Sequence, residues 1–292
     1  MLNFRSLGEI FFKSLILILI LGFSIAFISD PKVGAKNKLK VLNAGSLMIP
    51  FNQIEEKFEQ KHPDVDVQIE GHGSIQVIRH ITEIQDSVDV AAVADFSLIP
   101  LLMYKTTLEG SDKPYANWYI KFAVNNLGIA YTENSKHWEE INEENWFKIF
   151  QRSGAKFGIS DPRMDACGYR ALILARLAED YYSEEKLFEK LMGNNFKRFP
   201  IKSIDIIGMK KTIFQEILIP KTEKIMLRGS SMNLLAPLET GGLDYGFQYE
   251  SVAKQHNLKF LKLPEQINLG SKDFQDSYNE VKVKLDYQRF SS

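Results

Sequence analysis

Residues 38–70 read KLKVLNAGSLMIPFNQIEEKFEQKHPDVDVQIE, and this stretch decides the fold class. KLKVLNAG is typical of a short buried strand. Phe51, Ile54 and Phe58 then fall on one face of a predicted helix that Pro63 ends. DVDVQIE alternates as a second strand does. A strand, a helix and a strand in this order predict a parallel pair joined by a right-handed crossover.

The alternation continues along the chain. SIQVIRHITEIQ predicts an amphipathic helix, DVAAVAD a third strand, and FSLIPLLMY a further helix. WYIKFAVNNLGIAYT predicts a long extended segment, after which strands and helices alternate again to LKFLKLP. The tail SYNEVKVKLDYQRFSS alternates like a strand, while the lysine-rich stretch around residues 193–224 predicts surface loops and irregular strand. The order is that of an α/β fold with a parallel sheet.

Two Gly-Ser turns follow the first two predicted strands, at Gly45-Ser46 and Gly73-Ser74. Ligands of such sheets bind outside the carboxyl ends of the strands. We expect each serine to cap the next helix and to bring a hydroxyl and unpaired N–H groups to one edge. These groups can bind an anion without any basic residue.

The first 35 residues predict an export segment. SLILILILGFSIAFIS is about as long as a signal-peptide core and short for a spanning helix, and Val33-Gly34-Ala35 suits a cleavage site. The segment holds no cysteine, which excludes a lipid anchor on that residue. We expect an extracytoplasmic protein whose leader is cleaved near residues 36–40 or kept as a membrane tether; an internal buried helix is the alternative.

Composition excludes several classes of function. The net charge of -1 gives no overall field that would attract nucleic acid. The single cysteine, Cys167, rules out an intramolecular disulfide framework and a multi-cysteine zinc site.

The turn around Cys167 allows several interpretations. As a nucleophile Cys167 needs a base, and His72 is the one histidine in a predicted turn of this edge. A metal site of His72, Asp165 and Cys167 has no supporting spacing. Asp165 as the N-cap of the helix ACGYRALILARL is a plain structural alternative, and Arg170 and Arg79 are expected at caps or the surface.

Turns of one kind also occur at residues 165–168 and 229–231, each between a predicted strand and a predicted helix. Together with the two Gly-Ser turns and Tyr249, they would suit a small oxyanion in a cleft between two lobes. A carboxylate there would repel sulfate or phosphate. It becomes favourable if Asp165 bonds to the central atom of molybdate or tungstate, which can expand its coordination.

Several stretches together resemble the archaeal tungstate/molybdate ABC-transporter solute-binding family. They are AGSLMIPFNQIEEKFEQKHPDVDVQIEGHGS, DVAAVADFSLIPLLM, WYIKFAVNNLGIAYT, SDPRMDACGYR, LLAPLETGGLDYGFQYESVAKQHNLKFLKLP and INLG. The resemblance covers almost the whole chain after residue 40.

The resemblance implies a two-lobed α/β fold like that of type II periplasmic binding proteins, with a two-stranded hinge and a cleft between the lobes. Residues 38–122 plus 248–292 would form the first lobe and 123–247 the second. It implies a monomer without cofactor or turnover that passes tungstate or molybdate to a membrane permease driven by an ATPase. The family's oxyanion site would match Ser46, Leu47, Ser74, Asp165, Ala166, Cys167 and Tyr249, with Asp165 as the carboxylate that reaches the metal.

The sequence departs from the family pattern at two turns. DPRMDACG replaces the usual Asn-Pro-Asn-Asp-Pro-Cys-Gly, and Ser231 in RGSSMN stands where a second carboxylate, a glutamate, is expected. Ser231 would then donate a hydrogen bond instead of coordinating. Two rival functions follow from the residues: a binding protein for sulfate or phosphate, and a cysteine-dependent hydrolase using Cys167 and His72.

Overall fold

The computed structural model describes residues 36–197, 204–206, 209–213 and 218–284. The predicted export segment, residues 1–35, lies outside the described residues. None of the helices in the described ranges is both long and apolar enough to cross a bilayer.

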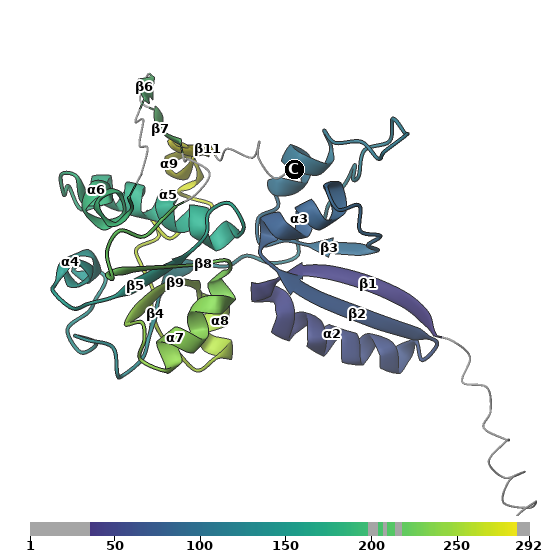
Figure 1. Cartoon of the computed structure of the whole chain (residues 1–292), viewed down its shortest axis with the longest axis horizontal. Helices are drawn as coiled ribbons and strands as arrows, with labels where there is room; N and C mark the ends of the chain where they lie inside the picture. Colours follow the sequence, from purple (N-terminus) through teal and green to yellow (C-terminus); the bar gives the residue numbers. More distant parts are fainter. Residues whose placement is uncertain (1–35, 198–203, 207–208, 214–217, 285–292) are drawn as a thin grey trace, which may run out of the picture.

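The first sheet has three parallel strands in the order β2-β1-β3. They are β1 (Asn37–Ala44), β2 (Val65–His72) and β3 (Val90–Ala92). Helices α2 (Met48–Lys61) and α3 (Ser74–Thr82) connect them and lie on opposite faces of the sheet (Figure 1). The predicted strand-helix-strand order and its parallel strand pair are confirmed. Leu42 of β1 and Ile75 and Ile78 of α3 are fully buried between the sheet and the helix.

The chain then leaves the first sheet through two less regular segments. The stretch predicted as a helix after β3 forms a short π-type turn, η2 (Ile99–Met103), with Pro100 in its first turn. Residues 117–126 are extended without strand pairing and carry the chain to the second sheet.

The second sheet is mixed, with the order β10-β4-β9-β5-β8. β5 is parallel to β8 and β9, and β4 is antiparallel to β9 and β10. The strands are β4 (Leu127–Tyr131), β5 (Phe157–Ser160), β8 (Ile225–Arg228), β9 (Tyr245–Tyr249) and β10 (Lys259–Leu261). The helices around it are α4 (Trp146–Gln151), α5 (Ala166–Tyr181), α6 (Leu187–Leu191), α7 (Leu235–Glu239) and α8 (Glu250–Gln255).

A third, small sheet has the order β11-β7-β6. Its strands are β6 (Ile204–Ile206), β7 (Met209–Ile213) and β11 (Val281–Lys284), and the short helix α9 (Gln275–Asn279) precedes β11. The lysine-rich stretch predicted as irregular therefore contributes two strands, and other parts of it lie outside the described residues.

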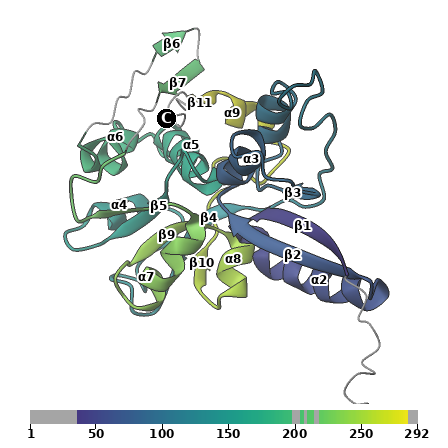
Figure 2. The same cartoon turned by 45° about the vertical axis from the view of Figure 1, so that its right-hand side comes forward.

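We call the first sheet with its helices the first lobe, and the second sheet with its helices the second lobe; both views show them side by side (Figures 1 and 2). The predicted two-lobed α/β class is confirmed. Aromatic packing fills the second lobe, where Trp146, Phe150 and Phe247 are at most 1 % exposed and contact one another edge to face.

The strand pairing differs from the predicted grouping of residues 248–292 with the first lobe. β10 pairs with β4, with Phe260 opposite Ala130, and β11 pairs with β7. The reason is local, because α8 is only six residues long and Asn257, at a φ of 54°, turns the chain back at once. β10 is therefore an edge strand of the second sheet, next to β4.

Candidate functional site

Ser46 and Ser74 lie at the carboxyl edge of the first sheet, as predicted, and are 7 % and 0 % exposed. Neither caps a helix. Ser46 lies in the short turn η1 (Gly45–Leu47), and Leu47 is the N-cap of α2. Gly73 is the N-cap of α3, and Ser74 Oγ instead accepts a 3.0 Å hydrogen bond from the backbone N–H of Ala94. The predicted caps were wrong because Ser46 lies within η1, one residue before the N-cap Leu47, and because the oxygen of Ser74 accepts from a distant backbone N–H.

Asp165 lies at the carboxyl edge of the second sheet and caps α5, which confirms its predicted structural role. Its Oδ1 accepts from the N–H of Cys167 at 3.4 Å, and its Oδ2 accepts from the N–H of Ser231 at 2.6 Å. Ser231 begins the short turn η4 (Ser231–Leu234). The turns meet because β5 and β8, which precede them, are neighbouring parallel strands.

Burial dominates the electrostatics of this carboxyl group. Asp165 is only 4 % exposed, and desolvation raises its pKa above the ordinary value. The N–H of Ser231, the hydroxyls of Ser160 and Ser231 and the N–H of Cys167 oppose the shift without cancelling it. The site thus holds an acid that takes up a proton more readily than a solvated aspartate does.

The two lobes touch at these turns through their backbones. The carbonyl oxygen of Met164 accepts hydrogen bonds from the N–H groups of Ile75 at 3.1 Å and Gln76 at 3.4 Å. A Cβ at Gly73 would lie 2.2 Å from that oxygen, and one at Gly45 would lie 2.7 Å from Cγ of Met232. Glycine is therefore required where the turns of the first lobe approach those of the second.

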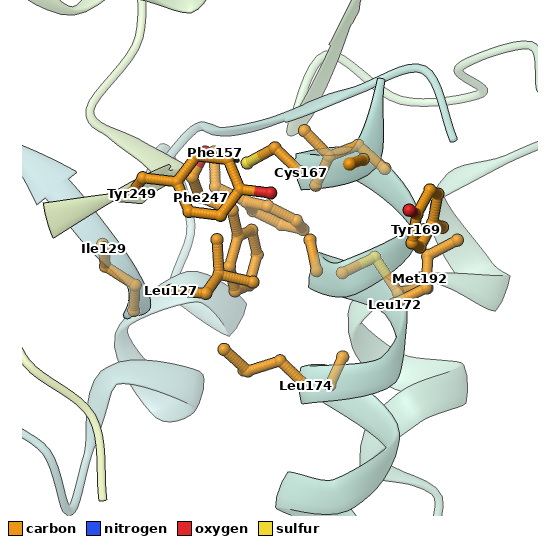
Figure 3. Close-up of a cluster of buried hydrophobic side chains, with 14 of the residues drawn as sticks. Leu127, Ile129, Phe157, Cys167, Tyr169, Leu172, Leu174, Met192, Phe247 and Tyr249 are labelled. Carbon is orange, nitrogen blue, oxygen red and sulfur yellow. Dashed lines mark hydrogen bonds between the residues drawn. The ribbon is translucent and has the colours of Figure 1, made fainter. Parts of the chain in front are cut away.

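Cys167 is packed inside the second lobe. It is 0 % exposed, and its Sγ donates to the carbonyl oxygen of Phe247 at 3.4 Å. Figure 3 shows the sulfur pointing from the first turn of α5 toward Phe247 and Tyr249. Desolvation and the nearby Asp165 raise the pKa of the thiol well above its ordinary value, so the group is held as a thiol.

His72 does not pair with Cys167. Its Nε2 lies 2.8 Å from Oε1 of Glu70, and its ring lies 4.3 Å from the ring of His80. Within the described ranges, no group of three or more His, Cys, Asp or Glu side chains could hold a metal ion. The arrangement supports neither the nucleophile-base pair nor the metal site of His72, Asp165 and Cys167.

Tyr249 ends β9 and is 2 % exposed. Its hydroxyl oxygen accepts from Nη1 of Arg170 at 3.4 Å. Burial raises the pKa of Tyr249, and the charge of Arg170 only partly opposes this. The tyrosine therefore keeps its proton and can donate it to a ligand.

Three residues of this region were not expected in the site: Asp95, Tyr169 and Arg170. Tyr169 donates to Asp95 Oδ2 at 2.5 Å, and Arg170 Nη2 lies 3.4 Å from the same oxygen. Of the three, Asp95 could have been predicted from the sequence, since it follows the third strand at the same edge as Ser46 and Ser74. Arg170, expected at a cap or the surface, instead joins the lobes.

Several donors face this region without a protein acceptor among the described residues. They are the hydroxyl protons of Ser46, Ser74 and Tyr249 and the N–H of Ala166, which is the first residue of α5. These donors come from both lobes, at the turns where Met164, next to Asp165, accepts from Ile75, next to Ser74. Such a set can bind an oxyanion.

Comparison with known proteins places these features in a family. Residues 39–278 match the family described as bacterial extracellular solute-binding protein. An uncharacterized solute-binding protein of Methanococcus maripaludis is 36 % identical over 98 % of this chain and 80 % of its own length. The molybdate/tungstate-binding protein WtpA of Pyrococcus abyssi is 37 % identical over 88 % of this chain and 72 % of its own length.

Solved structures share the fold at low sequence identity. The periplasmic molybdate-binding protein of Azotobacter vinelandii has a TM-score of 0.50 and 16 % identity, covering 79 % of this chain and 81 % of that one. The sulfate-binding protein SubI of Mycobacterium tuberculosis has a TM-score of 0.52 and 11 % identity, covering 84 % and 80 %. Both likenesses concern the fold alone.

Proposed function

This chain belongs to the bacterial extracellular solute-binding protein family, and on that premise we propose that it captures tungstate or molybdate for uptake by an ABC transporter. The relative from Pyrococcus abyssi named as molybdate/tungstate-binding supports this choice of solute. The protein would bind and release its oxyanion unchanged.

One observation carries the proposal: the buried carboxyl group of Asp165 is held by the N–H groups of Cys167 and Ser231 at the turn where Met164 contacts the first lobe. A site made only of donors would suit any oxyanion, whereas a carboxylate repels one unless it gains a bond in return. The central atom of tungstate or molybdate can accept a carboxylate oxygen, and that of sulfate cannot. Asp165 would therefore select the metal oxyanions.

The remaining predicted residues would hold the oxygen atoms of the anion. Ser46 with Leu47 and Ser74 would contribute from the first lobe, and Ala166, Cys167 and Tyr249 from the second. Ser231 already donates its N–H to Asp165, so its part would be to orient that carboxylate. With one carboxylate at the site, the metal would gain one protein oxygen.

The family also supports the proposed partners. A solute-binding protein works at the outer face of the cell membrane and delivers its ligand to a permease driven by an ATPase. We propose that the protein acts there as a monomer, held by its leader or by its permease.

Calorimetric titration of the protein with tungstate, molybdate and sulfate tests the proposal. We expect binding heat with both metal oxyanions and weaker or no heat with sulfate. Ser46→Ala should weaken tungstate binding about tenfold, the effect of losing a hydrogen bond to a charged group. Ser271→Ala, which removes a hydroxyl bonded only within its own turn, serves as the matched control. Absence of heat with both metal oxyanions would refute the proposal.

Capture of sulfate or phosphate is the second candidate. It is favoured by Ser231, because a serine in place of a second carboxylate leaves less negative charge against an anion that cannot coordinate. Tighter binding of sulfate or phosphate than of tungstate in the same titration would favour it. The hydrolase alternative has no support, since Cys167 is buried as a thiol without a base.

A further inference from the structure

Arg170 connects the two lobes and a candidate ligand residue at the same time. It is the fifth residue of α5, in the second lobe. Its Nη1 donates to the carbonyl oxygen of Ala94 at 3.2 Å and to the hydroxyl oxygen of Tyr249 at 3.4 Å, and its Nη2 lies 3.4 Å from Asp95 Oδ2. Ala94 and Asp95 follow β3, in the first lobe.

The guanidinium group decides which way the hydroxyl of Tyr249 points. An arginine side chain has only donors, so Tyr249 Oη must accept in their contact. Its proton must then point elsewhere, and no described residue accepts it. Tyr169 is the opposite case, because its hydroxyl proton is donated to Asp95. Figure 3 shows Cys167 on the side of α5 that faces Tyr249 of β9, and Tyr169 on another side of the helix.

The same arrangement holds for Ser74 in the first lobe. Ser74 Oγ accepts from the N–H of Ala94 at 3.0 Å, which leaves the serine proton available as a donor. The carbonyl oxygen of the same residue, Ala94, accepts from Arg170. A continuous chain of contacts thus runs from Ser74 through Ala94 and Arg170 to Tyr249, and it crosses from one lobe to the other.

We propose that Arg170 is a positioning residue that fixes Tyr249 as a hydrogen-bond donor only when the lobes are closed, and so couples lobe closure to oxyanion binding. This inference rests on the proposed function of the site. The contacts with Ala94 and Asp95 require the first lobe to be in place, and the contact with Tyr249 aims the donor. Opening of the lobes would break the contacts of Arg170 with Ala94 and Asp95, and the guanidinium group would no longer be held in place against Tyr249.

A double-mutant cycle between Arg170 and Tyr249 tests the coupling, with tungstate, molybdate and sulfate as probes in calorimetry. We expect Arg170→Met to weaken the tightest-bound of these anions about tenfold in the wild-type background. In the Tyr249→Phe background the same change should cost less than about twofold, because the hydroxyl that Arg170 aims is gone. A purely structural role would give equal losses in both backgrounds and would overturn the inference.

Two controls keep the test independent of folding. Arg176→Met removes another arginine of α5, one that bonds Glu179 at 2.7 Å, and should leave the affinity unchanged. Arg170→Lys keeps the charge but cannot make the three contacts at once, so it should weaken binding in the wild type and not in Tyr249→Phe. If the wild type binds none of the three anions, the proposed function fails and this inference with it. If it binds and the cycle shows no coupling, this inference alone fails.

Discussion

The backbone N–H of Ser231 donates a 2.6 Å hydrogen bond to Oδ2 of Asp165, the shorter of the two bonds that hold this carboxylate. The serine that stands in place of an expected glutamate therefore supports the remaining carboxylate instead of adding another. Asp165 is held by N–H groups on both oxygens while it is 4 % exposed. The effect of Asp165 on the affinity of the protein for its ligand and its effect on the stability of the fold can be predicted separately.

Asp165→Asn should weaken tungstate and molybdate binding more than sulfate binding. The amide keeps the size and the capping ability of the side chain but loses the anionic oxygen that would bond to the metal. We expect tungstate to bind at least about tenfold more weakly, because a bond to a charged group is lost. We expect sulfate to bind more tightly, because the repulsion by the carboxylate is removed. Titration of both proteins with the anions measures this. Equal losses for all anions would mean that Asp165 serves only as a helix cap.

The pH dependence of binding should have opposite signs for the two kinds of anion. Burial raises the pKa of Asp165, so this group takes up its proton at a higher pH than a solvated aspartate. As the pH falls through that pKa, tungstate should bind more weakly, because a protonated carboxyl group does not coordinate. Sulfate should bind more tightly, because the repulsion disappears. A pH series of titrations measures both trends, which Asp165→Asn should abolish; the same sign for both anions would contradict the prediction.

The same pKa shift predicts that Asp165 costs stability at neutral pH. A folded-state pKa raised above the unfolded value means that the charged form destabilises the fold above that value, and that stability is gained as the pH falls through the folded pKa. Asp165→Asn removes the buried charge and keeps one oxygen for the cap, although its NH2 group cannot accept from the N–H of Ser231, so its Tm at pH 7 should exceed that of Asp165→Ala. Asp165→Ala loses the cap, which costs about 0.5–2 kcal/mol. Thermal unfolding compares the variants, and an Asn variant less stable than the Ala variant would contradict this account.

Cys167 should not react with thiol reagents until the protein unfolds. It is buried, its pKa is raised, and its Sγ donates to Phe247. A colorimetric thiol assay should therefore give almost no signal in native buffer and one thiol per chain in denaturant. Cys167→Ala should retain tungstate binding, because the residue contributes its backbone to the turn. Rapid labelling of the native protein would show that the thiol is accessible after all.

Local features of this fold could be predicted from the sequence, and contacts between distant segments could not. The strands of the first sheet and the capping of α5 by Asp165 depend on residues within a few positions of one another. Ser74 was misjudged as a cap because its partner, Ala94, lies twenty positions away. The pairing of β10 with β4 joins segments more than a hundred residues apart, and no local pattern in the sequence predicts it.

The residues of the candidate site also fall into those that a local sequence pattern predicts and those that only the packing of distant segments reveals. The four turns of the site share a pattern of small and polar residues after each strand, so the sequence alone points to these turns as the candidate site. Arg170 looks like an ordinary helix residue in the sequence, and only the packing of one lobe against the other reveals its contact with Asp95. Residues that act across the lobes leave no local pattern.

Asp95→Asn should destabilise the protein at neutral pH, and the difference from the wild type should shrink only in strong acid. Burial alone would raise the pKa of Asp95, but the charge of Arg170, the hydroxyl of Tyr169 and two bonds from Ser97 hold it below the ordinary value. Removing one partner of a buried pair costs about 3 kcal/mol because the other charge is left uncompensated.

The sign of the acid effect follows from the direction of this shift. A folded pKa below the unfolded value, which is about 3.9 for aspartate, contributes stability that is complete above the unfolded value and is lost as the pH falls through the folded one. The gap in Tm between the wild type and Asp95→Asn should therefore stay constant from pH 7 to pH 5 and narrow below about pH 4. Asp86→Asn, at a half-buried carboxylate of the same lobe that pairs with Lys40, is the matched control and should show a much smaller gap at neutral pH. A gap for Asp95→Asn that has already closed at pH 5 would mean that Arg170 does not hold this carboxylate in its charged form.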